Sequence, residues 1–316
     1  MSKKVQLACE AMATRWEFVL MGEDESRLRS AGEEAIEEIR WLERQMNFYD
    51  ASSDVSRINR MASNGPVRVE PQLFALLQRC VELGRMTEGA FDITVAPLLK
   101  LWGFVQKDMK VPAEEDIART LERVGMDKLL LNEQDFTLSF TVPDMLIDLG
   151  SIGKGYALDR AMEILGEYEI TSALVHGGTS AIATIGEPLD GAHWRVGLEH
   201  PNNQLHPEGE LRRLGYVNLP GLAFGVSAVW GKAFQSQDRL YGHVLDPRTG
   251  WPTTGAVYAA LKGTSNTVID ALATAALVMG ESFLALEAGE IEGSLLFCVD
   301  GKGLKEVTKN FSYVRE

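Results

Sequence analysis

Cysteine is scarce in this sequence of 316 residues, and its three cysteines lie far apart. Cys9, Cys80 and Cys298 form no C-x-x-C pair, so a disulfide framework and a cysteine-based metal site are both excluded. We also find no stretch of about 18 apolar residues, so we expect no transmembrane segment. The apolar part of the start, MSKKVQLACEAMATRW, is too short for a signal peptide. We therefore expect a cytoplasmic protein with reduced thiols, or an exported one if a leader precedes this sequence.

Positive charge is in short supply as well. The chain has 31 lysines and arginines against 45 aspartates and glutamates, which gives a net charge of −14 and a pI near 4.9. Such a surface repels nucleic-acid backbones and anionic lipids, so we expect no nucleic-acid partner. A phosphate-bearing ligand would need local compensation by a cation, backbone N–H groups or a metal.

The hydrophobic content of 45% is enough for a sizeable core, and the sequence has no repeats or clear linker. We expect a single domain over 1–316, or two intimate lobes at about 1–147 and 148–316. The patterning predicts an α+β fold of mostly antiparallel sheets with helices packed outside. Helices are expected at 26–45, 71–86, 113–124, after the glycine-rich bend at 148–155, and at 266–279. Strands are expected at 5–10, 16–21, 137–141, 145–148, 172–175, 194–198, 216–219, 222–227, 242–245, 256–261 and 294–299, with a surface loop at 202–215.

One candidate motif is the segment GAFDITVAPLLKLWGF at 89–104, in which Asp92 lies between Phe91 and Ile93. A carboxylate in apolar company needs partners, because burying it unpaired is costly. Asp92 is therefore either part of a binding site or a buried helix-capping residue.

A second motif is DLGSIGKGYALD at 148–159, where three glycines surround Lys154 just before an expected helix. Such a bend lets backbone N–H groups approach an anion, and the helix N-terminus adds favourable potential. The order of residues matches neither the Walker A motif nor the Rossmann fingerprint. The alternative is a purely structural strand-to-helix turn.

Two further motifs lie near the C-terminus. His243 in YGHVLDPRTGWP is either a general base at neutral pH or a structural histidine. Asp270 and Thr274 in NTVIDALATAALVMG are four residues apart, so they share one face of a helix. Their hard oxygen atoms suit Mg²⁺ rather than Zn²⁺, although a threonine that bonds back to its own helix would look the same.

Taken in order, these motifs make the sequence resemble the ApbE family of FAD:protein FMN transferases, once labelled thiamine biosynthesis lipoproteins. The likeness runs over about 11–280 and includes eight elements. They are AMATRW, FYDASSDVSRIN, GAFDITVAPLLKLWGF, DLGSIGKGYALD, the pair Gly177-Gly178, WRVGLEHP, GHVLDPRTGWP and IDALATA. The resemblance implies an ApbE-like, T-fold-like architecture.

The resemblance also implies a site and a reaction. The FAD-binding residues would be Met12, Tyr49, Ala90, Phe91, Asp92, Asp148, Lys154 and Val244. The Mg²⁺ ligands would be Asp270, Thr274 and the backbone carbonyl of Ser151, and His243 would be the general base. FMN from FAD would be attached to a Ser or Thr hydroxyl, with release of AMP. The partner would be a flavin-acceptor protein, such as a flavoprotein subunit of a sodium-pumping NADH:quinone oxidoreductase or a related electron-transfer complex.

The sequence departs from the family pattern at several positions. Ala13 stands where glycine is usual, and His176 and Thr179 replace the usual residues around the glycine pair. In the T-S-G-x-Y-x-R stretch only Ser227 is unchanged, while Trp230 replaces the tyrosine and Lys232 the arginine. A lysine lacks the bidentate fork of arginine. Two alternatives follow: an FAD pyrophosphatase that uses water and releases FMN and AMP, and a non-catalytic flavin-binding paralogue.

Overall fold

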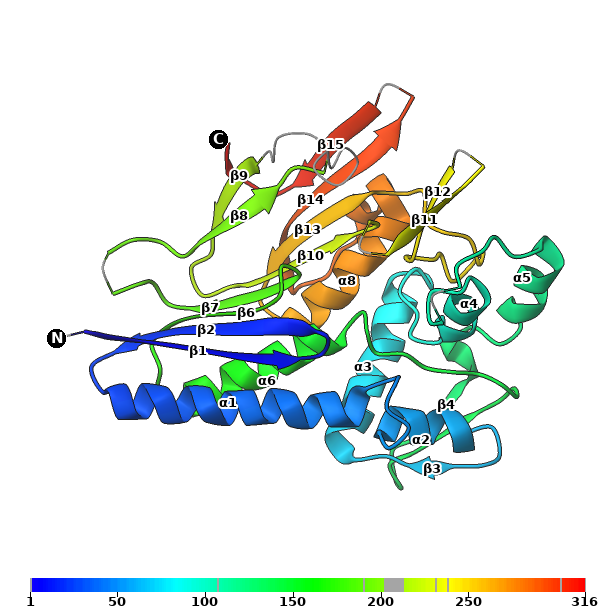
Figure 1. The fold of residues 1–316 in the computed structure, drawn as a ribbon, viewed down its shortest axis with the longest axis horizontal. Helices are drawn as coiled ribbons and strands as arrows, with labels where there is room; N and C mark the ends of the chain where they lie inside the picture. The colour runs from blue at the N-terminus through cyan, green and yellow to red at the C-terminus, as the bar shows by residue number, and fades with distance from the viewer. Residues whose placement is uncertain are drawn as a thin grey trace.

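The computed structural model describes residues 2–106, 108–189, 191–201, 213–230, 232–237, 239–301 and 303–315. Its centre is an eight-stranded sheet, antiparallel throughout, in the order β1-β2-β6-β7-β10-β13-β14-β15 (Figure 1). The bounds of these strands are β1 (Lys3–Ala11), β2 (Thr14–Gly22), β6 (Ser172–Gly177), β7 (Ala181–Ile185), β10 (Ala223–Ala228), β13 (Tyr258–Gly263), β14 (Ile291–Asp300) and β15 (Gly303–Lys309).

Three smaller strand groups surround this sheet. One has the order β16-β9-β8, the second β3-β5-β4, and the third is the ribbon β11-β12. Their strands are β3 (Val67–Arg68), β4 (Leu129–Asn132), β5 (Thr137–Phe140), β8 (Arg195–Glu199), β9 (Arg213–Asn218), β11 (Ala233–Ser236), β12 (Arg239–Gly242) and β16 (Val314–Arg315).

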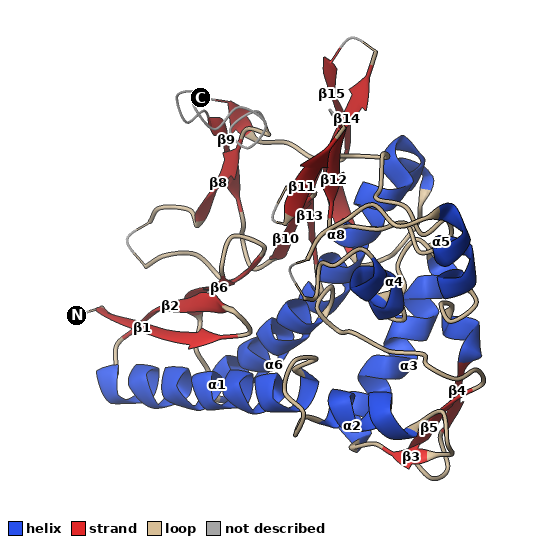
Figure 2. Cartoon of the chain, turned by 45° about the vertical axis from the view of Figure 1, so that its right-hand side comes forward, coloured by secondary structure: helices blue, strands red, loops and turns tan. Residues whose placement is uncertain are grey.

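The helices α1 (Glu25–Met46), α6 (Gly153–Glu167) and α8 (Asn266–Met279) form a row on one face of the large sheet (Figures 1 and 2). The shorter elements are α2 (Asp54–Met61), α3 (Pro71–Met86), α4 (Ala96–Leu101), α5 (Glu114–Leu121) and the 3₁₀ turns η1 (Met126–Lys128) and η2 (Gly280–Ala285). The expected α+β class, with helices outside antiparallel sheets, is confirmed. Helix α8 is the exception to the outside position, because 12 of its 14 residues are buried between the sheet and other helices.

Burial of α8 also accounts for its apolar composition. Among the described residues, one segment, Asn266–Ala285, is long and apolar enough to cross a membrane, and two-thirds of it is buried inside the protein. The segment is not an unbroken apolar run, because it contains Asn266, Asp270 and Glu281. A core helix of a water-soluble protein passes the same test, so its composition is weak evidence for a membrane span.

Local sequence explains where the long helix α1 begins and which face it buries. The Asp24 carboxylate accepts hydrogen bonds from the N–H groups of Ser26 and Arg27, at 3.0 and 3.2 Å, and so caps the first turn. Residues at helical spacing then face the sheet and are buried, among them Leu28, Ile39 and Leu42. The expected helix at 26–45 is confirmed.

The main hydrophobic core includes residues from both halves of the chain, from Val5 to Cys298. All three cysteines are buried and unpaired, as expected. The proposed division into two lobes stays a prediction.

Two expected strands are wrong. Residues 145–148 form no strand; instead, the Asn59 side chain accepts the N–H of Ile147 at 2.8 Å and donates to its carbonyl at 2.9 Å. An amide side chain thus takes the place of a neighbouring strand. At 242–245, Gly242 ends β12 and Leu245 makes only an isolated bridge with Pro252, because the chain turns at once.

Other elements were placed differently or missed. The expected helix at 113–124 is shorter, as α5, and the expected loop at 202–215 overlaps β9 at 213–215, while 202–212 lie outside the described residues. Sequence periodicity did not predict α2 and α4, because each spans only about two turns, which is too short for a helical repeat to be recognised.

Candidate active site

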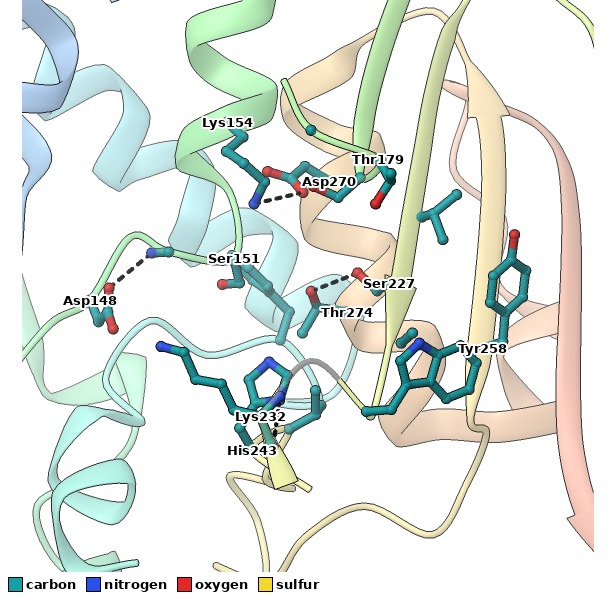
Figure 3. A pocket seen from close by; sticks show the side chains of 18 of the residues that line it. Asp148, Ser151, Lys154, Thr179, Ser227, Lys232, His243, Tyr258, Asp270 and Thr274 are labelled. Atoms are coloured by element: carbon teal, nitrogen blue, oxygen red, sulfur yellow. Dashed lines mark hydrogen bonds and ion pairs between the residues drawn. The ribbon is translucent and has the colours of Figure 1, made fainter. Parts of the chain in front are cut away.

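A single large cavity of about 1010 Å³ brings together most of the expected site residues (Figure 3). Eleven of the twelve line it: Tyr49, Ala90, Phe91, Asp92, Asp148, Ser151, Lys154, His243, Val244, Asp270 and Thr274. They come from loops, from the start of α6 and from α8, so only the tertiary fold assembles them. Their individual roles stay predictions.

The centre of the cavity is built where α6 approaches α8. Gly155 permits this approach, since a Cβ there would lie 2.2 Å from the carbonyl oxygen of Asn266. Asp159, one turn further along α6, accepts hydrogen bonds from the N–H groups of Asn266 and Thr267 at the start of α8, at 2.9 and 2.8 Å. The glycine-rich bend is therefore a helix-packing device as well as a lining of the cavity.

This packing brings two charged side chains together. The Gly155 N–H donates to Oδ2 of Asp270 at 2.9 Å, and Nζ of Lys154 lies 4.0 Å from Oδ1. Asp270 is only 4% exposed, and burial raises its pKa. The Lys154 charge and the N–H groups of Gly155 and Lys154 oppose that rise without cancelling it. A further cation near Asp270 would therefore stabilise its charged form.

One turn after Asp270, Thr274 extends the polar surface. Its Oγ1 lies 3.3 Å from Oγ of Ser227 on β10, and Ser151 lies on the bend nearby (Figure 3). Among the described residues, no group of three or more His, Cys, Asp or Glu side chains could hold a metal. One carboxylate with neighbouring hydroxyls still fits Mg²⁺, which takes few protein ligands and completes its shell with water and phosphate oxygens.

His243 follows β12 and is held by the backbone of Lys232. Its Nδ1 lies 3.1 Å from the Lys232 carbonyl oxygen, which also accepts the His243 N–H at 2.9 Å. A proton on Nδ1 would donate to this carbonyl and leave the Nε2 lone pair available. Burial, helped by the charges of Lys232 and Lys154, lowers the pKa of His243, against the opposing effect of the carbonyl. The imidazole is therefore neutral at pH 7, as a general base must be.

Asp148 lies at the other side of the bend. Its Oδ1 accepts the Gly150 N–H at 2.9 Å. Burial raises its pKa, and the Gly150 N–H and the charges of Lys232 and Lys154 oppose the rise. Tyr49 lines the cavity and is 64% exposed. Its ring is therefore open to contact with a ligand.

Asp92 is buried, and its carboxylate already has hydrogen-bond partners. Its Oδ1 accepts hydrogen bonds from the N–H and the Oγ1 of Thr94, at 2.7 and 2.5 Å. Burial raises its pKa, and these bonds act against the rise. The carboxylate therefore stabilises a turn rather than capping a helix, since α4 begins later, with Val95 at its N-cap.

Met12 is the one expected residue that does not line the cavity. It lies in the turn between β1 and β2 with φ of 51°, and its N–H donates to Oε1 of Glu43 at 2.6 Å. Ala13 follows with φ of 58°. Glycine is usual at position 13 in the family because it adopts this left-handed conformation easily. This reason fits the structure better than the close approach of a ligand.

Several cavity residues were missed as site residues in the sequence. Lys232 adds a second cation beside Asp148 and His243, and Ser227 pairs with Thr274. Arg195, Trp230 and Tyr258 line the side formed by strands. The family-like stretch around Ser227 and the element WRVGLEHP, which contains Arg195, carried a signal for some of these positions. Neither indicated which side chains face the cavity.

The fold and the cavity define an α+β protein in which Lys154, Lys232, Asp270 and a histidine of lowered pKa line one cavity. Comparison with known proteins agrees, since the ApbE family model matches residues 12–292. The chain therefore belongs to the ApbE family.

Two sequence relatives are FAD:protein FMN transferases. That of Haemophilus influenzae is 29% identical over 322 residues, which cover 98% of this chain and 90% of the relative. That of Vibrio cholerae is also 29% identical, with coverages of 96% and 90%. The family and these relatives identify the chain as a transferase.

Solved structures show the same architecture. The flavin transferase ApbE from Vibrio cholerae matches with a TM-score of 0.84 at 28% identity, over 98% of this chain and 97% of that one. The ApbE protein from Thermotoga maritima matches with a TM-score of 0.83 at 27% identity, over 96% of each chain. The fold expected from the motifs is thus confirmed.

Proposed function

We propose that this chain is a Mg²⁺-dependent FAD:protein FMN transferase that attaches FMN to a Ser or Thr hydroxyl of a flavin-acceptor protein and releases AMP. The observation that carries the proposal is the convergence of Lys154, Asp270, Thr274 and His243 on one cavity. The names of the relatives support FAD and a protein as the two substrates.

Binding of a diphosphate suits the start of α6. Lys154, in the first turn of α6, supplies positive charge in a protein with a net charge of −14. The N-terminal end of the helix adds a potential that favours an anion. Lys232 adds a second ammonium group to the same cavity. The two ammonium groups offset the negative charge of a diphosphate, which the rest of this acidic surface would repel.

Mg²⁺ would be held by Asp270, Thr274 and the Ser151 carbonyl, with Ser227 beside them. When bound, the ion would offset charge on the phosphoryl oxygens and on the departing AMP. The raised pKa of Asp270 supports this assignment, because a buried carboxylate with one distant lysine is left incompletely compensated.

The transfer needs one proton acceptor and one position for the attacking oxygen. Nε2 of His243 removes the proton from the acceptor hydroxyl, whose oxygen forms a bond to the FMN-side phosphorus. The bond from that phosphorus to the bridging oxygen breaks, and AMP leaves with the bridging oxygen and its electron pair. Lys154 and Lys232 stabilise the negative charge that moves onto the leaving group.

The substitutions Trp230 and Lys232 favour a second candidate function, an FAD pyrophosphatase. Water would replace the acceptor hydroxyl at the same base, and FMN and AMP would both be released. A single-point ammonium at Lys232 orients a phosphate less strictly than a guanidinium fork would. A flavin-binding paralogue without turnover is the remaining alternative.

One experiment separates these three functions. The protein is incubated with FAD, Mg²⁺ and the acceptor subunit of a sodium-pumping NADH:quinone oxidoreductase, and intact mass and AMP are measured. We expect covalent FMN on the acceptor, lost in His243→Ala and retained in His193→Ala, whose histidine is exposed and pairs with Glu187. Equal free FMN and AMP without acceptor labelling would indicate the pyrophosphatase, and bound FAD without either product the paralogue.

A further inference from the structure

Most residues of the cavity wall are not among the expected FAD, metal and catalytic residues. Figure 3 shows Asp148 and Tyr258 on opposite sides of the Thr274–Ser227 pair. Of the expected FAD residues, Figure 3 labels Asp148 and Lys154, which lie away from Tyr258, and the strands β8, β10 and β13 contribute other residues of the lining. We name this second part the strand-side compartment and define it by Thr179, Arg195, Gly197, Glu199, Trp230 and Tyr258.

One wall of the compartment is strand β8, which is an edge strand. It pairs with β9 on one side only, and no strand in the part of the chain that the structure describes pairs with its other edge. Arg195, Gly197 and Glu199 are exposed and line the cavity, the half-buried Val196 lines it as well, and Leu198 is buried in the second hydrophobic cluster.

The register of β8 indicates where its free backbone groups point. Leu219 N–H donates to the Trp194 carbonyl at 3.0 Å, so Trp194 and Leu219 form a hydrogen-bonded pair. In an antiparallel ladder such pairs alternate with non-bonded ones. The next residue, Arg195, and then Gly197 therefore direct their N–H and C=O groups away from β9, to the outer edge. An edge of this kind is a template for another extended chain.

The chemistry of the compartment suits a peptide rather than a diphosphate. Arg195 and Glu199 place opposite charges at its two ends, and Glu199 would repel phosphate. Between them the floor is apolar, with buried Ile182, Phe224 and Tyr258, and Trp230 stacks on Tyr258 with ring centroids 6.1 Å apart. A peptide presents both charge signs, apolar side chains and a backbone that can pair.

We propose that an extended segment of the acceptor protein adds to the free edge of β8 and so brings its Ser or Thr hydroxyl to His243. This inference rests on the proposed transferase function. The other substrate, FAD, would occupy the opposite part of the cavity, so both would meet at the Asp270–Thr274 centre.

A substitution at Gly197 tests the proposal without disturbing the fold. A Cβ built there has nothing within 4 Å and its φ is not in the left-handed region, so a leucine fits the strand and fills the compartment. Gly166 on α6 is also open, is exposed and lies outside the cavity lining, and Gly166→Leu is the matched control.

The probe is the purified acceptor subunit of a sodium-pumping NADH:quinone oxidoreductase, and covalent FMN is measured against its concentration. We expect Gly197→Leu to raise the acceptor KM at least about tenfold and Gly166→Leu to leave it unchanged, with FAD affinity kept in both. An unchanged acceptor KM in Gly197→Leu would overturn the inference. If the wild-type protein labels no acceptor, the transferase function itself fails, and this inference with it.

Hydrogen exchange gives a second, substitution-free measurement. Adding the acceptor to the wild-type protein with FAD is expected to slow amide exchange in 195–199. Slowed exchange elsewhere on the surface, with 195–199 unprotected, would place the acceptor at another site and overturn the inference.

Discussion

Nζ of Lys154 lies 4.0 Å from Oδ1 of Asp270, although the two residues are 116 positions apart in the sequence. This separation is too long for a direct hydrogen bond. The lysine therefore weakens the burial effect on the carboxylate without abolishing it, in line with the raised pKa of Asp270. The negative charge of Asp270 is therefore only partly compensated in the absence of a further cation.

Asp270→Asn is expected to weaken Mg²⁺ binding at least about tenfold, because a charged oxygen ligand is lost. Titration of Mg²⁺ in the turnover assay measures this change. Asp246→Asn is the control, since Asp246 pairs with Arg248 outside the cavity lining. Equal Mg²⁺ affinity in Asp270→Asn and wild type would show that the ion binds elsewhere.

The same Asp270→Asn variant is expected to be more stable than the metal-free wild type at pH 7. Because burial raises the pKa of Asp270 in the folded state, its charged form costs stability. That cost grows as pH rises above the unfolded pKa and is complete once pH has passed the folded pKa. Below the unfolded pKa of about 3.9 the wild-type side chain is neutral and the difference disappears. Melting temperatures measured without metal across this pH range test the prediction; a difference independent of pH would contradict it.

Lys154→Ala is expected to weaken FAD binding at least about tenfold at low salt and by less at high salt, because salt screens the attraction between the ammonium and the diphosphate. Fluorescence titration of FAD at two ionic strengths measures both effects. Lys305→Ala is the control, since Lys305 is exposed and pairs with Glu281. A salt-independent loss would point to a packing role for Lys154 instead.

The pH profile of kcat/KM is expected to have its acid limb below pH 6.5, because burial and two lysines lower the pKa of His243 from 6.5. Lys232→Ala keeps the carbonyl that holds Nδ1 but removes one positive charge. The acid limb in that variant should therefore move to higher pH. A limb that stays in place would mean that another group titrates in this range.

Gly155→Ala is expected to destabilise the protein by about 2 kcal/mol, because its Cβ would collide with the Asn266 carbonyl and the Asp270 Cβ, at 2.2 and 2.7 Å. Gly166→Ala on the same helix meets no atom within 4 Å and should be neutral or stabilising by about 0.5 kcal/mol. Urea unfolding of both variants tests the pair; equal stabilities would show that α6 and α8 can separate without cost.

Long helices could be predicted because the residues that define them lie within one segment of the sequence. The helices at 71–86 and 266–279 were placed at the residues where the structure has them, since apolar spacing and N-terminal capping residues define them within one segment. The wrongly expected strand at 145–148 could not be judged in this way. The backbone of Ile147 pairs with the Asn59 side chain, and no pattern near either segment indicates that contact.

The sequence by itself determined the class of fold, the family and most of the residues that line the cavity, because each motif carries its own turn chemistry or helix face. Only the tertiary structure decided which of these residues meet. Gly155 lets α6 approach α8 and so brings Lys154 to Asp270. The backbone N–H of Met12 bonds to Glu43, and Met12 does not line the cavity. The free edge of β8 is likewise a property of the assembled sheets: whether a strand has a neighbour depends on the arrangement of distant segments, which no local pattern specifies.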